Sequence, residues 1–322
     1  MADKPVDSLN GLSSEIIATA VASSAEADSP VSGETNENIN STSAQPKRES
    51  SQWLTLTLFR HGECRNNQTT YTLAYYDDQR DVLTKKGEEQ SQALGRDFAN
   101  IHFDTILCSP LKRATQTAEY LLKSNDTNPA PPVRHWDLLK EQDHGPEFRS
   151  LMLRGYRDAA YELRIPRGNP RNHRPGSGES AADVEKCCID TIWRLMMWFA
   201  REVPQSPEGL DDESKSCGLQ VSIAELAGHP DCKPDTLPPG VPHVGIVSHN
   251  LFLTELVEAL LSWHSESHAD TSVQFQSGSW ARVVLRWDPS DEKATSERSA
   301  HDIQVALPGC LDVWFLKGPS WY

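Results

Sequence analysis

The sequence predicts an α/β protein, a three-layer sandwich with helices on both faces of a mostly parallel central sheet. Two observations predict this class. Short apolar segments alternate along the chain with longer segments of helical character, which is the order from which parallel sheets are built. The apolar segments are also continuous, without the alternation of polar and apolar residues that a sheet with one face in water would show. Such strands are buried on both faces.

Three short apolar segments predict the buried strands. Residues 53–59 (WLTLTLF) combine β-branched, aromatic and aliphatic side chains and end at a polar cluster. Residues 104–108 (DTILC) and 243–247 (HVGIV) have the same character. Closer to the C-terminus, residues 272–287 predict one or two further strands, and residues 311–316 predict another.

Four segments between and after these strands predict helices. Residues 84–100 begin with a threonine that is suited to cap the helix. Residues 109–122 place Pro110 in a first turn, where its missing N–H costs no hydrogen bond. Residues 179–203 form a long helix that is apolar on nearly all sides, and residues 251–263 form the last helix.

Composition sets the domain boundaries. Residues 1–50 contain no Phe, Trp or Tyr and have eight acidic but only three basic residues. Because such a segment cannot bury enough apolar surface to offset its chain entropy, we expect a disordered acidic, Ser-rich tail. Residues 51–322 then form one folded domain. Residues 204–240, which include six prolines, form an insertion on its surface.

The charge and the cysteines exclude several classes of protein. With 46 Asp and Glu against 31 Lys and Arg, the net charge is −15, which disfavours nucleic acid and anionic membranes as partners. No apolar segment approaches the roughly 18–20 residues of a membrane span. The seven cysteines are odd in number and scattered, which indicates a reducing compartment rather than a disulfide framework. We therefore expect a cytoplasmic protein, or one shared between cytoplasm and nucleus.

The motif Arg60-His61-Gly62 follows the first predicted strand. In open α/β sheets, ligands bind at the carboxyl ends of the strands. An arginine there can hold a phosphate through two parallel hydrogen bonds. The neutral imidazole of His61 can attack phosphorus with one ring nitrogen while a hydrogen bond holds the other. Taken alone, the motif also fits a plain turn with an exposed arginine.

Further motifs accompany this one in a fixed order. They are Asn67, six residues after the histidine, and residues 83–91 (LTKKGEEQS), 109–118 (SPLKRATQTA) and 244–249 (VGIVSH). Together they resemble the histidine phosphatase superfamily, the phosphoglycerate-mutase-like proteins, in its cytosolic branch. The secreted acid-phosphatase branch follows its second histidine with aspartate, where this chain has Asn250. The resemblance extends over residues 53–263.

The resemblance implies a role for each residue of these motifs. His61 is the nucleophile that takes the phosphoryl group. Arg60, Arg113 and His249 surround the phosphate, and Asn67 adds a hydrogen bond to it. Physical chemistry agrees with this arrangement, because phosphoryl transfer places charge on three equatorial oxygens that fixed cations can stabilise.

The leaving oxygen needs a proton, which the family takes from a glutamate after a further strand. Glu141 occupies that place and its spacing to Gly145 matches the family's pattern, whereas Asp143 is the competing carboxyl group. A carboxyl group beside a phosphate dianion has its pKa raised by the like charge, so it can remain protonated near neutral pH. We therefore expect Glu141 to be the general acid.

Three more residues complete the candidate substrate-binding set. Arg65 adds positive charge next to the pocket. Asn250 stands where the family commonly has glycine, so it narrows the pocket. Ser180 belongs to a Gly-Glu-Ser sequence that opens the long helix in many members, and it either contacts the ligand or caps that helix.

This set of residues predicts a metal-independent phosphatase that hydrolyses phosphate monoesters through a phosphohistidine intermediate. Its expected partner is a phosphorylated small-molecule substrate, and it is expected to need neither a metal nor another cofactor. Two alternatives remain open. A phosphoglycerate-type mutase would shield the phosphohistidine from water until the phosphate returns to the substrate. A phosphate-binding pseudoenzyme would act through interactions, although the complete set of catalytic side chains argues against it.

Overall fold

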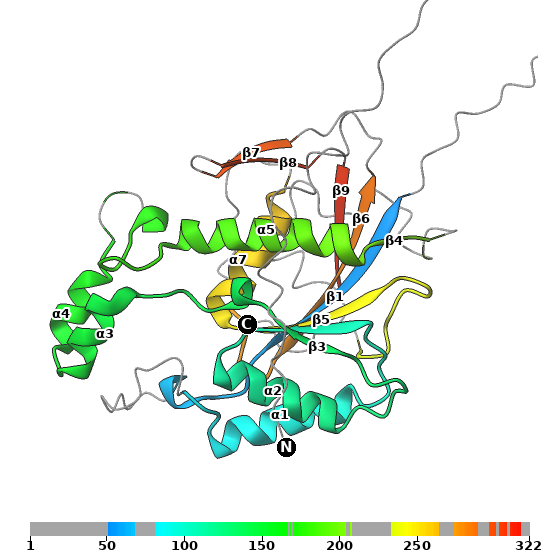
Figure 1. Cartoon of the computed structure of the whole chain (residues 1–322), viewed down its shortest axis with the longest axis horizontal. Coiled ribbons are helices and arrows are strands. Elements are labelled where there is room, and N and C mark those ends of the chain that lie inside the picture. The colour runs from blue at the N-terminus through cyan, green and yellow to red at the C-terminus, as the bar shows by residue number, and fades with distance from the viewer. Residues whose placement is uncertain are drawn as a thin grey trace, which may run out of the picture. The chain divides into compact units, whose positions relative to one another are not determined.

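A computed structural model gives the architecture of the chain (Figure 1). It describes residues 51–67, 81–166, 168, 170–203, 207, 233–263 and 274–288, and the strands at 296–300, 303–307 and 310–316. All of these belong to the unit that begins at Arg48. The expected tail at residues 1–50 and most of the expected insertion at residues 204–240 lie outside the described residues.

Within the described residues, a seven-stranded sheet forms the centre of the fold, with the strand order β3-β2-β5-β1-β6-β9 and a short β4 beside β1. The strands of this sheet are β1 (Gln52–Arg60), β2 (Thr105–Cys108), β3 (Val133–His135), β4 (Arg201–Glu202), β5 (His243–Ser248), β6 (Trp280–Asp288) and β9 (Cys310–Leu316). The part β3-β2-β5-β1 is parallel throughout. A separate hairpin pairs β7 (Ser296–Ala300) with β8 (Ile303–Leu307).

The α/β class is confirmed, and the predicted buried strands β1, β2 and β5 form the parallel part of the sheet. The sheet as a whole is mixed, because β6 runs antiparallel to β1 and β9 antiparallel to β6. β3 was not predicted from the sequence. Its side chains are exposed or only partly buried, so it contains no continuous apolar segment.

Helices cover both faces of the sheet, with α1 and α2 on one side and α5 and α7 on the other (Figure 1). The α-helices are α1 (Lys85–Asp97), α2 (Lys112–Lys123), α3 (Gly145–Leu153), α4 (Arg157–Leu163), α5 (Ala181–Phe199) and α7 (Asn250–Leu261). Short 3₁₀ helices are η2 (Arg65–Asn67), η4 (Asp137–Leu139) and η5 (Pro170–Asn172). None of the described helices is long and apolar enough to cross a membrane.

The predicted start of α1 is confirmed, but α1 ends at Asp97 rather than at residue 100, and two further helix boundaries also differ from the prediction. Thr84 caps α1, and its side-chain oxygen accepts a hydrogen bond from the backbone N–H of Gly87. α2 begins at Lys112, so Pro110 precedes the helix instead of lying in its first turn. α5 ends at Phe199 rather than at residue 203, because the backbone becomes extended at Ala200 and then forms β4.

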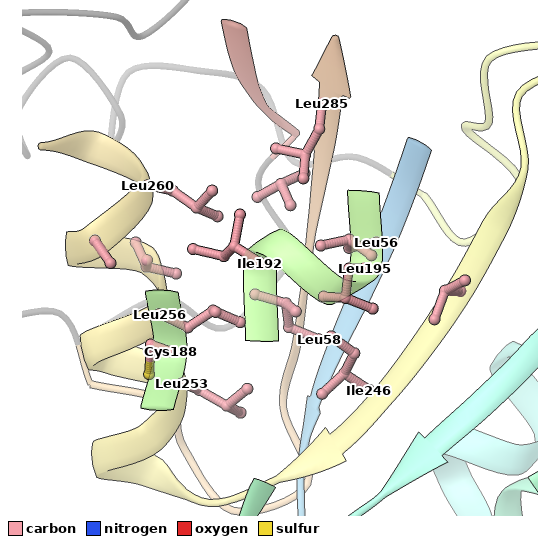
Figure 2. Close-up of a cluster of buried hydrophobic side chains, with 14 of the residues drawn as sticks. Leu56, Leu58, Cys188, Ile192, Leu195, Ile246, Leu253, Leu256, Leu260 and Leu285 are labelled. Carbon is pink, nitrogen blue, oxygen red and sulfur yellow. The ribbon is translucent and has the colours of Figure 1, made fainter. Parts of the chain in front are cut away.

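Buried apolar side chains lie on both faces of the sheet, as the continuous apolar strands predict. On one face, Leu56 and Leu58 of β1 pack with side chains of α5 and α7 such as Ile192 and Leu256 (Figure 2). Phe59 points to the other face and packs into the core beneath α1 and α2. The ends of β1 and β5 are therefore packed between two cores, one on each face of the sheet. This packing fixes the positions of the residues that follow the two strands.

Candidate active site

The carboxyl ends of β1 and β5 bring the two motif histidines together. Arg60 pairs with Ser248 in the last register position, and the backbone N–H of His61 donates to the carbonyl of Ser248 at 3.1 Å. His61 and His249 follow these strand ends, and their ring centroids lie 5.1 Å apart. Parallel pairing thus unites residues that are far apart in the sequence at one edge of the sheet.

Gly62 allows the turn after β1 to pack against α1. A Cβ atom at this position would lie 2.3 Å from the carbonyl oxygen of Gly87, so no side chain fits. The backbone N–H of Gly62 donates to the Thr117 hydroxyl of α2 at 3.1 Å. The turn that contains His61 therefore packs against α1 and is hydrogen-bonded to α2.

His61 has the orientation that a nucleophile needs. Its Nδ1 lies 2.7 Å from the carbonyl oxygen of Gly62, so Nδ1 carries the proton and donates it. Nε2 then presents a lone pair, and it has no hydrogen-bond partner among the described residues. Burial, followed by the charges of Arg113 and Arg60, lowers the pKa of His61 well below its usual range. The imidazole is therefore neutral.

His249 is held at both ring nitrogens. Arg113 Nε donates to His249 Nδ1 at 3.2 Å, so Nε2 carries the proton and donates it to Ser109 Oγ at 2.8 Å. Burial and the charge of Arg113 lower the pKa of this histidine as well. The sequence patterns assign no role to Ser109, although it opens the motif that contains Arg113; only the folded geometry shows that it orients His249.

Arg60 reaches over the end of the sheet toward the loop before β6. Its guanidinium Nη1 donates to the carbonyl oxygen of Phe275, and its backbone N–H donates to the Ser279 carbonyl at 3.0 Å. Burial lowers the pKa of Arg60, which the nearby carboxyl group of Glu141 opposes. Both Arg60 and Arg113 are thus close enough to Glu141 to influence its ionisation.

Glu141 and Asp143 have different environments, which separates the two candidate acids. Glu141 accepts hydrogen bonds from the backbone N–H groups of Gln142 at 3.2 Å and Leu251 at 3.4 Å. Burial raises its pKa, although Arg113 and these hydrogen bonds act in the opposite direction. Asp143 is exposed and forms an ion pair with Arg149 at 3.2 Å. Only Glu141 shares its surroundings with the two arginines.

Asp81 is a buried charged residue that the sequence patterns did not single out. One of its carboxylate oxygens, Oδ2, lies 3.8 Å from Arg113 Nη1, and both side chains are almost completely buried. The other oxygen, Oδ1, accepts a hydrogen bond from the backbone N–H of Asn66 at 3.3 Å. A single aspartate in a polar segment carries no sequence signal of such a contact.

The remaining predicted binding residues have structural partners. Asn67 Oδ1 accepts from the backbone N–H of Cys64 at 3.1 Å and from its thiol at 3.0 Å. Asn250 Oδ1 accepts from the backbone N–H of Phe275 at 2.9 Å. Ser180 caps α5: its side chain and that of Asp183 each accept a hydrogen bond from the other residue's backbone N–H. Of the two roles considered for Ser180, the structure shows the capping role. Arg65 lies exposed in η2.

Comparison with known proteins assigns the class. Residues 56–197 match the family described as histidine phosphatase superfamily (branch 1). Fructose-2,6-bisphosphatase TIGAR B of Danio rerio is 34% identical over 208 residues, which are 64% of this chain and 74% of that protein. The chain belongs to the histidine phosphatase superfamily, and it is a phosphoric monoester hydrolase of that type.

Two further similarities have lower sequence identity. Fructose-2,6-bisphosphatase TIGAR of Xenopus laevis is 29% identical over 140 residues, which are 42% of this chain. The match spans 47% of that protein, so this chain covers about half the length of that relative. Among solved structures, mycobacterial glucosyl-3-phosphoglycerate phosphatase has a TM-score of 0.45 and 20% identity, covering 81% of this chain and 98% of the other.

Proposed function

We propose that the chain is a metal-independent phosphomonoesterase that works through a phosphohistidine on His61, with Glu141 as general acid. One observation carries this proposal. The Nδ1–H of His61 is bound to the Gly62 carbonyl, which leaves Nε2 as a neutral nucleophile beside two arginines. Neutral imidazole held in this way is the reactive form for attack on phosphorus.

The first step forms the phosphohistidine. The Nε2 lone pair of His61 attacks phosphorus, the N–P bond forms, and the bond between phosphorus and the ester oxygen breaks. The proton of Glu141 passes to the departing oxygen, so the leaving group departs as an alcohol. The guanidinium groups of Arg60 and Arg113 stabilise the charge on the three remaining oxygens, without metal ions in our proposal.

The environment of Glu141 supports its role as the acid. Because the pKa of Glu141 is raised, some of the molecules keep this carboxyl group protonated at a pH where an ordinary glutamate would be ionised. The negative phosphate of a bound substrate would raise the pKa further. His249 is less suited to this role. Its only proton lies on Nε2, which donates to Ser109, and its pKa is lowered. His249 instead contributes to the pocket wall and holds Arg113.

The second step reverses the proton transfer. A water molecule attacks phosphorus, and the Glu141 carboxylate accepts one of its protons. The N–P bond breaks, inorganic phosphate is released, and His61 and Glu141 return to their starting protonation states. The Nδ1–H of His61 stays bound to the Gly62 carbonyl throughout, which stabilises the positive charge of the phosphorylated ring.

We further propose a phosphorylated small molecule as the substrate, in a cytoplasmic or nuclear setting. The two TIGAR relatives are named fructose-2,6-bisphosphatases, which makes sugar phosphates the first compounds to test. A panel of phosphate esters that varies the leaving alcohol would measure the selectivity.

An activity assay with one variant tests the proposal. The full chain should hydrolyse an aryl phosphate, and His61→Asn should lower the rate by at least about 10³-fold without changing the melting temperature. A chelator should leave the wild-type rate unchanged. A His61→Asn enzyme with near wild-type activity, or activity that a chelator removes and a divalent ion restores, would contradict the proposal.

A further inference from the structure

The guanidinium of Arg113 is held along two of its edges by protein groups. Its Nε donates to Nδ1 of His249 at 3.2 Å, and its Nη1 lies 3.8 Å from the carboxylate of Asp81. The side chains of Arg113 and Asp81 are 5% and 0% exposed, so this ion pair is shielded from water. Charges in such surroundings interact more strongly than they do at a surface.

Asp81 also belongs to the turn that follows β1. Its Oδ1 accepts the backbone N–H of Asn66, within η2. Burial, and then the neighbouring Asp81 charge, raise the pKa of the Cys64 thiol to about 12. The thiol is therefore protonated and does not act as a second anion toward Arg113. The Asp81 carboxylate links the turn after the nucleophile to the arginine on α2.

We propose that Asp81 is a positioning residue, which fixes the guanidinium plane of Arg113 against the phosphoryl group in the transition state. The inference rests on the proposed function, in which Arg113 stabilises the transferring phosphoryl group. The hydrogen bond at Nε and the ion pair at Nη1 together restrict rotation of the guanidinium about its last bonds. Two fixed contacts thus give Arg113 a single orientation before substrate arrives, as preorganised electrostatic catalysis requires.

This role predicts a split between catalysis and phosphate binding. Asp81 acts through Arg113, so removing its charge should affect the step that depends on orientation. Ground-state binding of an anion depends mainly on charge, and the loss of a nearby carboxylate makes the pocket more positive. Asp81→Asn should therefore lower kcat about tenfold to hundredfold, while the inhibition constant of inorganic phosphate stays constant or falls.

A double-mutant cycle on the full chain tests the inference. The enzymes are wild type, Asp81→Asn, Arg113→Met and the combination of both, with kcat and phosphate inhibition measured for each. In the Arg113→Met background, Asp81→Asn should have no further effect on kcat, because no guanidinium is left to position. Glu255→Gln is the matched control, since Glu255 is also a buried carboxylate that pairs with an arginine, Arg171. Its effect should be additive with Arg113→Met.

The melting temperature is a second readout, and it can be measured even if the single variants are inactive. Removing Arg113 alone leaves the buried Asp81 carboxylate without this cation, so the double variant should melt at a higher temperature than Arg113→Met. Unchanged kcat in Asp81→Asn, additive losses in the cycle, or a lower melting temperature of the double variant would overturn the inference. Near wild-type activity in Arg113→Met would instead overturn the proposed function, and the inference with it.

Discussion

Two groups of histidine and arginine side chains lie at or beside β1 and β5 and have different chemical character. The carboxyl-edge cluster consists of Arg60, His61, Arg113, Glu141 and His249. The interior cluster consists of Thr57, His243 and Arg282. Both contain a neutral histidine with a lowered pKa beside an arginine. Burial and a shifted pKa therefore do not distinguish a reactive site from a structural one in this protein.

The hydrogen bonds distinguish them. Both ring nitrogens of His243 have partners, Thr57 Oγ1 at 2.7 Å and the carbonyl of His102 at 2.8 Å. The guanidinium of Arg282 donates to Thr57 and to backbone carbonyls of the segment before β5, at residues 233, 234 and 236. In the carboxyl-edge cluster, Nε2 of His61 has no partner within the described part of the chain. The nitrogen that the fold leaves unused is the one that can react.

The largest expected effect concerns the carboxyl group of the carboxyl-edge cluster. Glu141→Gln keeps the shape of the side chain and removes its proton. Alkyl phosphates leave as strongly basic alkoxides and need that proton, so their hydrolysis should fall about 10²–10⁴-fold. Nitrophenyl phosphate needs little assistance and should lose far less. The ratio of the two rates is the measurement.

Asp143→Asn is the control for this variant. Asp143 is exposed and paired with Arg149, so its loss should slow the hydrolysis of alkyl and nitrophenyl phosphates equally, if at all. An exchange of behaviour between the two variants would assign the acid to Asp143. If neither variant depends on the leaving group, the proton comes from another source.

Matched arginine variants test the difference between the clusters directly. Arg113→Met should lower turnover per folded molecule about 10²–10³-fold, because it removes a cation from the transferring phosphoryl group. Arg282→Met removes the donor to Thr57 and to three backbone carbonyl groups, and should lower the free energy of unfolding by about 2–4 kcal/mol. Its turnover per folded molecule should be unchanged. A large loss of turnover in Arg282→Met would break the comparison.

The smallest effect is a dependence of stability on pH. Burial, and then the charge of Arg282, lower the pKa of His243 from 6.5 to about 3 in the folded protein. Between these values the unfolded chain binds a proton that the folded protein does not. The free energy of unfolding should therefore fall as the pH falls below about 6.5, by about 1.4 kcal/mol per pH unit for each such histidine.

His61 and His249 also have lowered pKa values and contribute to the same slope. His243→Gln should remove one histidine's share of it, which urea unfolding between about pH 7 and pH 5 can measure. An unchanged slope in this variant would mean that His243 is not neutral in the folded protein. The pH slopes of the wild type and the variant should differ least at the upper end of that range.

The fold could be predicted from the sequence where strands are buried on both faces. β1, β2 and β5 are continuous apolar segments because helices cover both sides of them. β3 escaped prediction because its side chains face water in part, and the antiparallel direction of β6 depends on how the chain returns to the sheet, which apolar content does not encode. The end of α5 was missed because its apolar pattern does not mark where β4 begins.

The site was predictable where side chains belong to motifs, and less so where they act through the fold. The motifs contain His61 and Arg113, and the structure brings both to one strand edge together with Glu141. Ser109 meets His249 because β2 pairs with β5, whereas Asp81 meets Arg113 because α2 packs beside the turn after β1. No local pattern of residues encodes such contacts, since their partners lie in other elements.

Trapping the phosphorylated enzyme tests the central claim most directly. Brief exposure of the full chain to a phosphate ester, followed by denaturation in base, should preserve an adduct on the nucleophile. Peptide mapping should place the phosphoryl group on His61, and acid should release it, because phosphoramidates are labile in acid and stable in base. The adduct should be absent from His61→Asn. A phosphoryl group on another residue, or an adduct that persists in His61→Asn, would contradict the claim that His61 is the nucleophile.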